Sequence, residues 1–195
     1  MPAAVDFYFD FSSPYGYLAS LEVDSLAARH GRVAAWRPIL LGVVFKTTGQ
    51  SPLLNQPLRG PYARHDLERT ARRLGVPYRL PEPFPVNAIA ASRAFYWLQD
   101  RDPAAALAFA RRVFAAVFVD GRDIGPPAVV ADLAGVKGVA AALDDPAVKD
   151  RLRREVEAAM ARGVFGSPTL VVDGEPFWGF DRFADVERWL AGGPW

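Results

Sequence analysis

The feature that most constrains the fold is the junction between an aromatic, apolar run and a helix start at Ser13-Pro14. Residues 5–11 predict a buried strand, and residues 14–30 predict a helix that stops at Gly31. Ser13 is suited to cap this helix and Pro14 to occupy its first position. We therefore expect a hydroxyl where unpaired backbone N–H groups and the positive end of a helix dipole can hold an anion.

A second strand is predicted over residues 33–40, directly after this helix. The order strand, helix, strand implies a parallel pair with a right-handed crossover. Pro38 indicates that the second strand lies at a sheet edge or ends early. A short helix is expected over residues 41–46, and the prolines and glycines of residues 47–61 predict a long loop of the kind that is often functional.

The middle of the chain is expected to be almost purely helical. Caps, prolines and glycines predict its helices over residues 62–74, 87–99, 103–118, 128–134 and 146–161.

The pattern then returns to strands. Residues 169–172 and 175–178 predict an antiparallel hairpin around Asp173-Gly174. A terminal helix is expected to start at Asp181 or Asp185.

These elements add up to an α/β chain with a thioredoxin fold (βαβ…ββα) and an all-helical insertion domain. The predicted domains are a thioredoxin-like domain of residues 1–60 and 163–195, and a helical insertion domain of residues 61–162.

Composition removes several classes of function. The chain has 195 residues and no cysteine, which excludes a disulfide oxidoreductase, a cysteine nucleophile and a cysteine-bound metal, and no metal is expected. With 23 basic and 22 acidic residues, it has no charge excess that would favour nucleic acid. No signal peptide or apolar run of membrane-spanning length is visible, so a cytoplasmic protein with no membrane partner is expected.

Ser13 could act in three ways. As a nucleophile it would need a base, but the two histidines are His30, more than about 20 Å away along the predicted helix, and His65, which has no evident orienting partner. No G-x-S-x-G elbow is present, which argues against a triad hydrolase. Ser13 could instead only cap the helix, or it could donate a hydrogen bond to a ligand's anion. A thiolate suits a helix N-terminus, and here it would come from outside, with glutathione as the abundant choice.

Two C-terminal motifs also allow a structural and a functional interpretation. Pro168 is either a plain strand-entry proline or the cis proline that faces the active-site helix in thioredoxin folds, where Ser167 would offer its backbone to a peptide. Asp181 is either a helix cap beside a core Trp178, or a ligand of the amino and carboxylate groups of a γ-glutamyl unit.

Three segments together carry a family resemblance. Residues 6–15 (DFYFDFSSPY), 163–169 (GVFGSPT) and 178–182 (WGFDR) resemble, in order and spacing, the 2-hydroxychromene-2-carboxylate isomerase family. That family is grouped with kappa-class glutathione transferases and DsbA-like proteins, and the similarity covers essentially the whole chain. It implies a glutathione-dependent cis–trans isomerisation of an unsaturated aromatic ketoacid, of the type that converts 2-hydroxychromene-2-carboxylate to trans-o-hydroxybenzylidenepyruvate.

The resemblance also implies roles for particular residues. Ser13 would be catalytic and contact the glutathione sulfur. The residues expected to bind glutathione are Ser13, Ser167, Pro168, Phe180, Asp181, Asp123 and Ile124. Lys46 would hold a substrate carboxylate, and Asn55 is a looser match for a substrate contact.

Two other functions stay open. One is a kappa-like glutathione transferase that conjugates electrophiles, and the other is a non-catalytic thioredoxin-fold module that binds peptides. The implied partners are glutathione and a small aromatic substrate, and a homodimer is expected by analogy alone.

Overall fold

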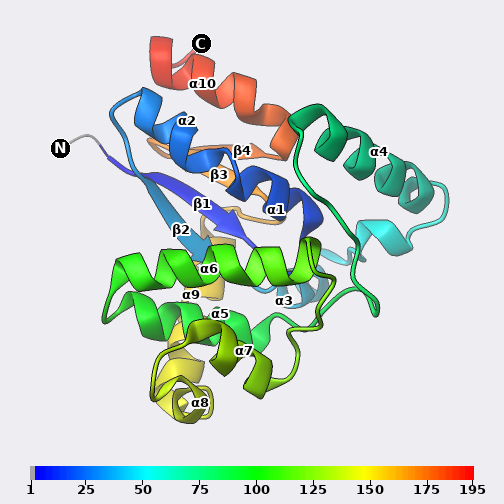
Figure 1. The fold of residues 1–195 in the computed structure, drawn as a ribbon. Helices are drawn as coiled ribbons and strands as arrows, with labels where there is room; N and C mark the ends of the chain where they lie inside the picture. The colour runs from blue at the N-terminus through cyan, green and yellow to red at the C-terminus, as the bar shows by residue number, and fades with distance from the viewer. Residues whose placement is uncertain (1–2) are drawn as a thin grey trace.

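A computed structural model gives the fold and describes residues 3–195 (Figure 1). The sheet has four strands in the order β2-β1-β3-β4. Strand β1 is parallel to β2 and antiparallel to β3, and β4 is antiparallel to β3. This is the predicted βαβ…ββα arrangement, so the thioredoxin fold with added helices is confirmed.

The strands are β1 (Val5–Phe9), β2 (Ala34–Pro38), β3 (Thr169–Val172) and β4 (Glu175–Trp178). The α-helices are α1 (Pro14–Ser20), α2 (Val23–Arg29), α3 (Leu41–Thr48), α4 (Arg59–Leu74), α5 (Ile89–Gln99), α6 (Pro103–Phe118), α7 (Pro127–Ala134), α8 (Val139–Ala142), α9 (Pro146–Ala161) and α10 (Phe183–Gly192). Two short 3₁₀ turns, η1 (Leu53–Asn55) and η2 (Phe180–Arg182), precede α4 and α10.

The core is built on the aromatic residues of β1 and the loop after it. Phe7, Phe9 and Phe11 are fully buried. The ring of Phe114, on α6, lies 5.3 Å from that of Phe9 and 5.2 Å from that of Phe11, measured between centroids. Helices α5 to α9 gather on one side of the molecule in Figure 1, yet α6 packs directly on the sheet. The sheet and the middle helices therefore share one hydrophobic core, and the division into two domains stays a prediction.

The helix predicted over residues 14–30 is interrupted, which corrects the sequence interpretation. Helix α1 ends at Ser20 and α2 begins at Val23. The Ser20 hydroxyl donates to the carbonyl of Tyr17 at 2.6 Å, and the Leu21 N–H donates to the carbonyl of Leu18 rather than to that of Tyr17. Such bonds from residue i to i−3 tighten the chain and end the regular α-helical pattern. The strand predicted to reach residue 11 also stops earlier, at Phe9.

The C-terminal hairpin is confirmed, but the start of the last helix is not. Asp173 and Gly174 have φ angles of 53° and 94°, the left-handed pair that a tight two-residue hairpin needs. Helix α10 begins at Phe183 without a side-chain cap. The prediction that it starts at Asp181 or Asp185 was therefore wrong, and so was the alternative that Asp181 is its cap. Asp181 lies in η2, and this turn carries it toward the pocket described below.

The remaining differences are small. Strand β2 is an edge strand that ends at Pro38, as predicted. Helix α5 begins at Ile89, two residues after the predicted cap, although the Asn87 side chain does accept a hydrogen bond from the Ile89 N–H. The short helix α8 was not predicted. Within residues 3–195, no helix has both the length and the apolar character that crossing a membrane requires.

Candidate functional site

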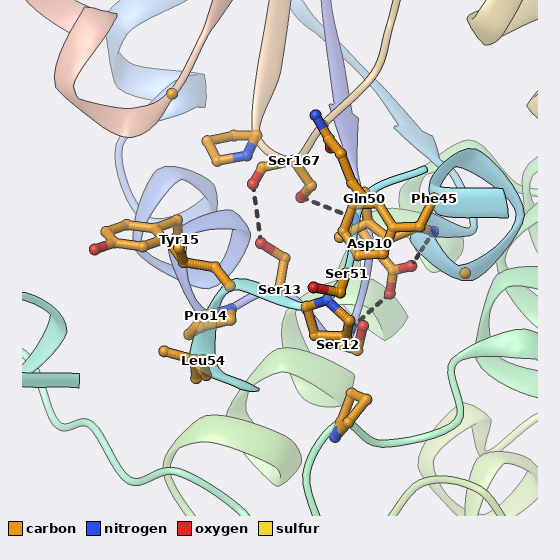
Figure 2. Close-up of a pocket in the computed structure, with 18 of the residues that line it drawn as sticks. Asp10, Ser12, Ser13, Pro14, Tyr15, Phe45, Gln50, Ser51, Leu54 and Ser167 are labelled. Carbon is orange, nitrogen blue, oxygen red and sulfur yellow. Dashed lines mark hydrogen bonds between the residues drawn. The ribbon is translucent and has the colours of Figure 1, made fainter. Parts of the chain in front are cut away.

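A large cavity of about 1230 Å³ opens where β1 ends. Its walls come from the loop before α1, from α3, from the segment through η1 into α4, from the loop before β3, and from η2. Figure 2 shows Ser13, Ser167 and Asp10 close together in this cavity, beside Gln50 and Ser51 of the loop after α3. Segments from both ends of the chain therefore meet at one site.

Ser13 is the N-cap of α1, as the sequence predicted. Its Oγ accepts a hydrogen bond from the Gly16 N–H at 3.1 Å and donates one to the carbonyl of Ser167 at 3.1 Å. The residue is only 5% exposed, although it lines the cavity. The hydroxyl can therefore turn toward a ligand atom in the cavity while it still accepts the bond from Gly16.

The loop before β3 faces Ser13 from the opposite side. The Ser167-Pro168 peptide bond is cis. The Ser167 Oγ accepts a hydrogen bond from the Asp10 N–H at 3.0 Å, and the Gly179 N–H donates to the carbonyl of Pro168 at 3.0 Å. These contacts join the end of β1, the loop of residues 162–168 (the cis-proline loop) and the residue before η2, so the backbone of Ser167 is held beside the start of α1.

The segment 178–182 forms the third wall of the cavity. Trp178 is 52% exposed, so the interpretation of this tryptophan as a core residue was wrong. Its indole covers Gly166, where a Cβ atom would overlap the ring. The Asp181 carboxylate is exposed and pairs with the Arg182 guanidinium at 2.8 Å. Phe180 is buried but also lines the cavity.

The structure brings most, but not all, of the predicted site residues together. Lys46, on the last turn of α3, lines the cavity with Ser13, Ser167, Pro168, Phe180 and Asp181. Three predicted residues do not line it. Asn55 is exposed and lies outside the cavity lining, although its neighbours Leu54 and Gln56 contribute to the wall. Asp123 accepts the N–H of Gly125 in its own turn, and Ile124 is fully buried in the core.

Asp10 is a site residue to which sequence reasoning assigned no role. It is 3% exposed, lines the cavity and accepts two backbone hydrogen bonds, from Ser12 and from Leu41, both at 2.7 Å. Burial raises the pKa of the Asp10 carboxyl, and the two N–H groups oppose that rise. The signal in the sequence was an acid at the end of an apolar strand, three residues before a helix cap.

Tyr15 and Asp66 were also missed, and they join α1 to α4. The Tyr15 hydroxyl donates to the Asp66 carboxylate at 2.8 Å, and Arg69 pairs with the same carboxylate. Burial raises the pKa of Tyr15, and the bond to Asp66 raises it further. Both Tyr15 and Asp66 line the cavity, so this contact fixes α4 as its outer wall.

Gly16 leaves no space for a side chain between the two serines. A Cβ atom there would lie 2.9 Å from the Ser167 Oγ and 3.1 Å from the Ser13 Cβ. We expect Gly16→Ala to push these serines apart and to lower kcat at least about tenfold. The free energy of unfolding should fall only slightly, because replacing glycine by alanine stabilises a helix by about 1 kcal/mol and offsets part of the cost. Steady-state kinetics and thermal unfolding measure the two effects.

Gly192→Ala is the matched control for this prediction. Gly192 is also helical, and a Cβ atom there would meet nothing within 4 Å. Its kinetics should equal those of the wild type. If the Gly16→Ala variant also has wild-type kcat, then the spacing of the two serines does not matter for activity.

The fold and the site together define a class of protein. A capped helix start faces a cis-proline loop across a cavity, and the sheet order is that of thioredoxin with extra helices. This is a thioredoxin-fold protein in which serine stands at the helix start and cysteine is absent.

Comparison with known proteins places the chain within that class. The family model of the DSBA-like thioredoxin domain matches residues 4–191. A 2-hydroxychromene-2-carboxylate isomerase of Sphingobium xenophagum is 31% identical over 194 residues, which cover 97% of this chain and 99% of the relative. The chain therefore belongs to the DSBA-like thioredoxin domain family and, within it, to the family of 2-hydroxychromene-2-carboxylate isomerases.

Two further similarities agree with this assignment. A solved structure of a 2-hydroxychromene-2-carboxylate isomerase is 30% identical with a TM-score of 0.86, and the match covers 97% of this chain and 95% of that one. Human glutathione S-transferase kappa 1 is 26% identical over 218 residues, covering 97% of this chain and 94% of the relative. The predicted family resemblance is thereby confirmed.

Proposed function

We propose that this chain is a glutathione-dependent isomerase that acts on the conjugated double bond of an unsaturated aromatic ketoacid of the 2-hydroxychromene-2-carboxylate type. One observation carries the proposal. In a chain without cysteine, the capping hydroxyl of α1 faces the carbonyl of Ser167, next to cis Pro168, inside a cavity large enough for two small molecules. The names of the similar proteins, an isomerase and a glutathione transferase, support the same function.

The groups around Ser13 fit glutathione. The hydroxyl and the start of α1 offer hydrogen-bond donors and a positive dipole end to a thiolate. The Ser167 carbonyl, which now accepts the Ser13 hydroxyl, would accept an N–H of the cysteinyl unit. Asp181, exposed at the cavity wall, would pair with the α-amino group of the γ-glutamyl unit, and the nearby backbone of η2 would hold its carboxylate.

The chemistry divides between the bound molecule and the chain. When bound, glutathione would supply a thiolate for reversible conjugate addition: the electron pair of the double bond would move onto the ketone oxygen, the resulting single bond could rotate, and return of the electron pair would expel the thiolate. Ser13 and the N–H groups of α1 stabilise the negative charge on sulfur before and after this cycle. Because this stabilisation is built into the fold, it needs no rearrangement at the moment of reaction.

Lys46 would hold the substrate. It lines the cavity from α3, and its ammonium is suited to pair with a substrate carboxylate as a compact charge. Apolar side chains line the same cavity and would contact the aromatic ring; they are Leu41, Phe45, Leu53, Leu54, Phe84 and Val86. The proposal leaves out Asn55, Asp123 and Ile124, because none of them lines the cavity. A homodimer and a cytoplasmic location stay predictions.

Two measurements test the proposed function. Calorimetry with reduced glutathione should show binding at or below millimolar concentration. With glutathione and the ketoacid present, product analysis should then show an isomerised product and unchanged total free glutathione. A stable glutathione conjugate would instead support the kappa-like transferase, and no binding at millimolar concentration would support the non-catalytic module.

A further inference from the structure

Asp10 uses every hydrogen-bonding group that it has, and all of them hold cavity walls. Its N–H donates to the Ser167 Oγ, and its carbonyl accepts the Ser13 N–H at 2.9 Å. Its carboxylate accepts the N–H of Ser12 through Oδ1 and that of Leu41 through Oδ2. In Figure 2, dashed lines run from Asp10 toward Ser167, Ser12 and the start of α3.

The carboxylate also supplies a cap that α3 lacks. Leu41 is the first residue of α3, and Leu40, at the N-cap position, makes no side-chain hydrogen bond. The first turn of α3 contains no acidic residue. The carboxylate of Asp10 therefore satisfies one of the unpaired N–H groups at the start of this helix, from a residue that directly follows β1 and lies 31 positions earlier in the chain.

This buried charge has no partner cation within residues 3–195. The N–H groups of Ser12 and Leu41 stabilise it, and the side chain of Ser12 contributes as well, so these hydrogen bonds compensate for its burial. A bond to a buried charge is stronger than a neutral one, and losing it costs more. The Asp10 carboxylate thus links the segment between β1 and α1 directly to the first residue of α3.

We propose that Asp10 is a positioning residue, which fixes α3, and with it Lys46, relative to the Ser13 hydroxyl. This inference rests on the proposed function, in which Ser13 serves glutathione and Lys46 serves the acidic substrate. Asp10 does not touch the reacting atoms in this role. It determines whether the two halves of the site lie at the correct separation for a glutathione-bound substrate.

Asp10→Asn is the variant that tests the proposal, since it keeps the size of the side chain. Asparagine has one acceptor oxygen, so it can serve only one of the two N–H groups, and its own NH₂ would face the other. We expect the KM for the acidic substrate, at saturating glutathione, to rise about tenfold, as it should in Lys46→Gln.

The double variant supplies the decisive comparison. If Asp10 acts by placing Lys46, then the double variant Asp10→Asn/Lys46→Gln should have a KM little higher than that of either single variant. The increase in KM should therefore be clearly smaller than the product of the two single increases. A merely structural role for Asp10 predicts independent, multiplicative effects on KM. Multiplicative effects would overturn the inference, and so would a wild-type KM in either single variant.

Asp24→Asn is the matched control. Asp24 is also a carboxylate with two hydrogen-bond donors, the Trp36 indole at 3.0 Å and the Arg111 guanidinium at 2.8 Å, but it does not line the cavity. The Asp24→Asn variant should lower the free energy of unfolding without changing the KM for the acidic substrate. Combined with Lys46→Gln, it should leave the effect of the lysine substitution unchanged.

Hydrogen exchange separates this inference from the proposed function. Asp10→Asn should accelerate exchange of the amides in the first turn of α3, and Asp24→Asn should not. This result does not depend on activity, so it can be obtained even if the wild type fails to isomerise the ketoacid. An unchanged exchange rate in α3 would overturn the inference while leaving the proposed function intact.

Discussion

Ser13→Ala is expected to lower kcat about 100- to 1000-fold, the usual loss when one preorganised donor to a developing or resting anion is removed. The variant keeps Pro14 and the helix dipole but loses the only side-chain hydroxyl that caps α1. Binding of glutathione should persist, because the Ser167 backbone and Asp181 are untouched. The pKa of the bound thiol should rise, since its thiolate loses a hydrogen-bond donor.

The stability of this variant should change much less than its activity. Loss of a serine cap costs about 1 kcal/mol. Steady-state kinetics, the ultraviolet absorbance of the bound thiolate across a pH series, and denaturant unfolding provide the three readouts. If Ser13→Ala has wild-type kinetics, the proposed role of this hydroxyl is wrong.

Ser20→Ala is the matched control for Ser13→Ala. Ser20 lies at the other end of the same helix, is buried, and donates its hydroxyl to the carbonyl of Tyr17 at 2.6 Å. It does not line the cavity. We expect this variant to lose a comparable amount of stability and to retain wild-type kcat, so that activity and helix stability are separated within one element.

The second large effect is expected in the core. Phe114→Ala should lower the free energy of unfolding by about 3–5 kcal/mol, the range found when a buried phenylalanine is truncated. The ring of Phe114 is 1% exposed and contacts rings from the sheet and from α1, including those of Phe9 and Tyr17. Phe9 and Tyr17 are themselves buried, so truncation of Phe114 should leave a cavity between them.

The same variant tests how the chain is divided. Phe114 belongs to the predicted helical insertion, whereas Phe9 belongs to the predicted thioredoxin-like domain. Because the two rings share one core, tryptophan fluorescence and far-ultraviolet circular dichroism should report one coincident, shifted transition in denaturant. Two separate transitions would show that the insertion unfolds by itself. Phe165→Ala, at a side chain that is 39% exposed, should cost far less stability.

Most of the fold was accessible from the sequence because its signals are local. The cap-proline pairs at residues 102-103 and 145-146 placed the starts of α6 and α9 correctly, since capping depends on a few adjacent residues. The break at Ser20 was not visible, because the residues around it continue an apolar helical pattern. It depends on a hydroxyl that competes for a backbone carbonyl, and serine offers that bond in some helices and not in others.

The candidate site could be predicted only in part from the sequence. Ser13 could be found because a capping residue is followed directly by a proline, and because the chain contains no cysteine that could take its place. Asp123 and Ile124 were placed by resemblance to a turn, but whether a turn reaches the cavity depends on how the middle helices pack. In this fold Ile124 is part of the core, and its turn leaves Asp123 bonded to its own backbone.

By itself, the sequence determined most of the strand and helix order, the hydroxyl at the start of α1, and, through the absence of cysteine, that any thiol at this site must belong to a ligand. Only the tertiary structure decided what that hydroxyl faces and what holds it there. The bond from Ser13 to Ser167 joins residues 154 positions apart, and the bond from Asp10 to Ser167 joins residues 157 apart. Such contacts depend on which strands become neighbours in the sheet, and burial of the aromatic core, rather than any local pattern, sets that order.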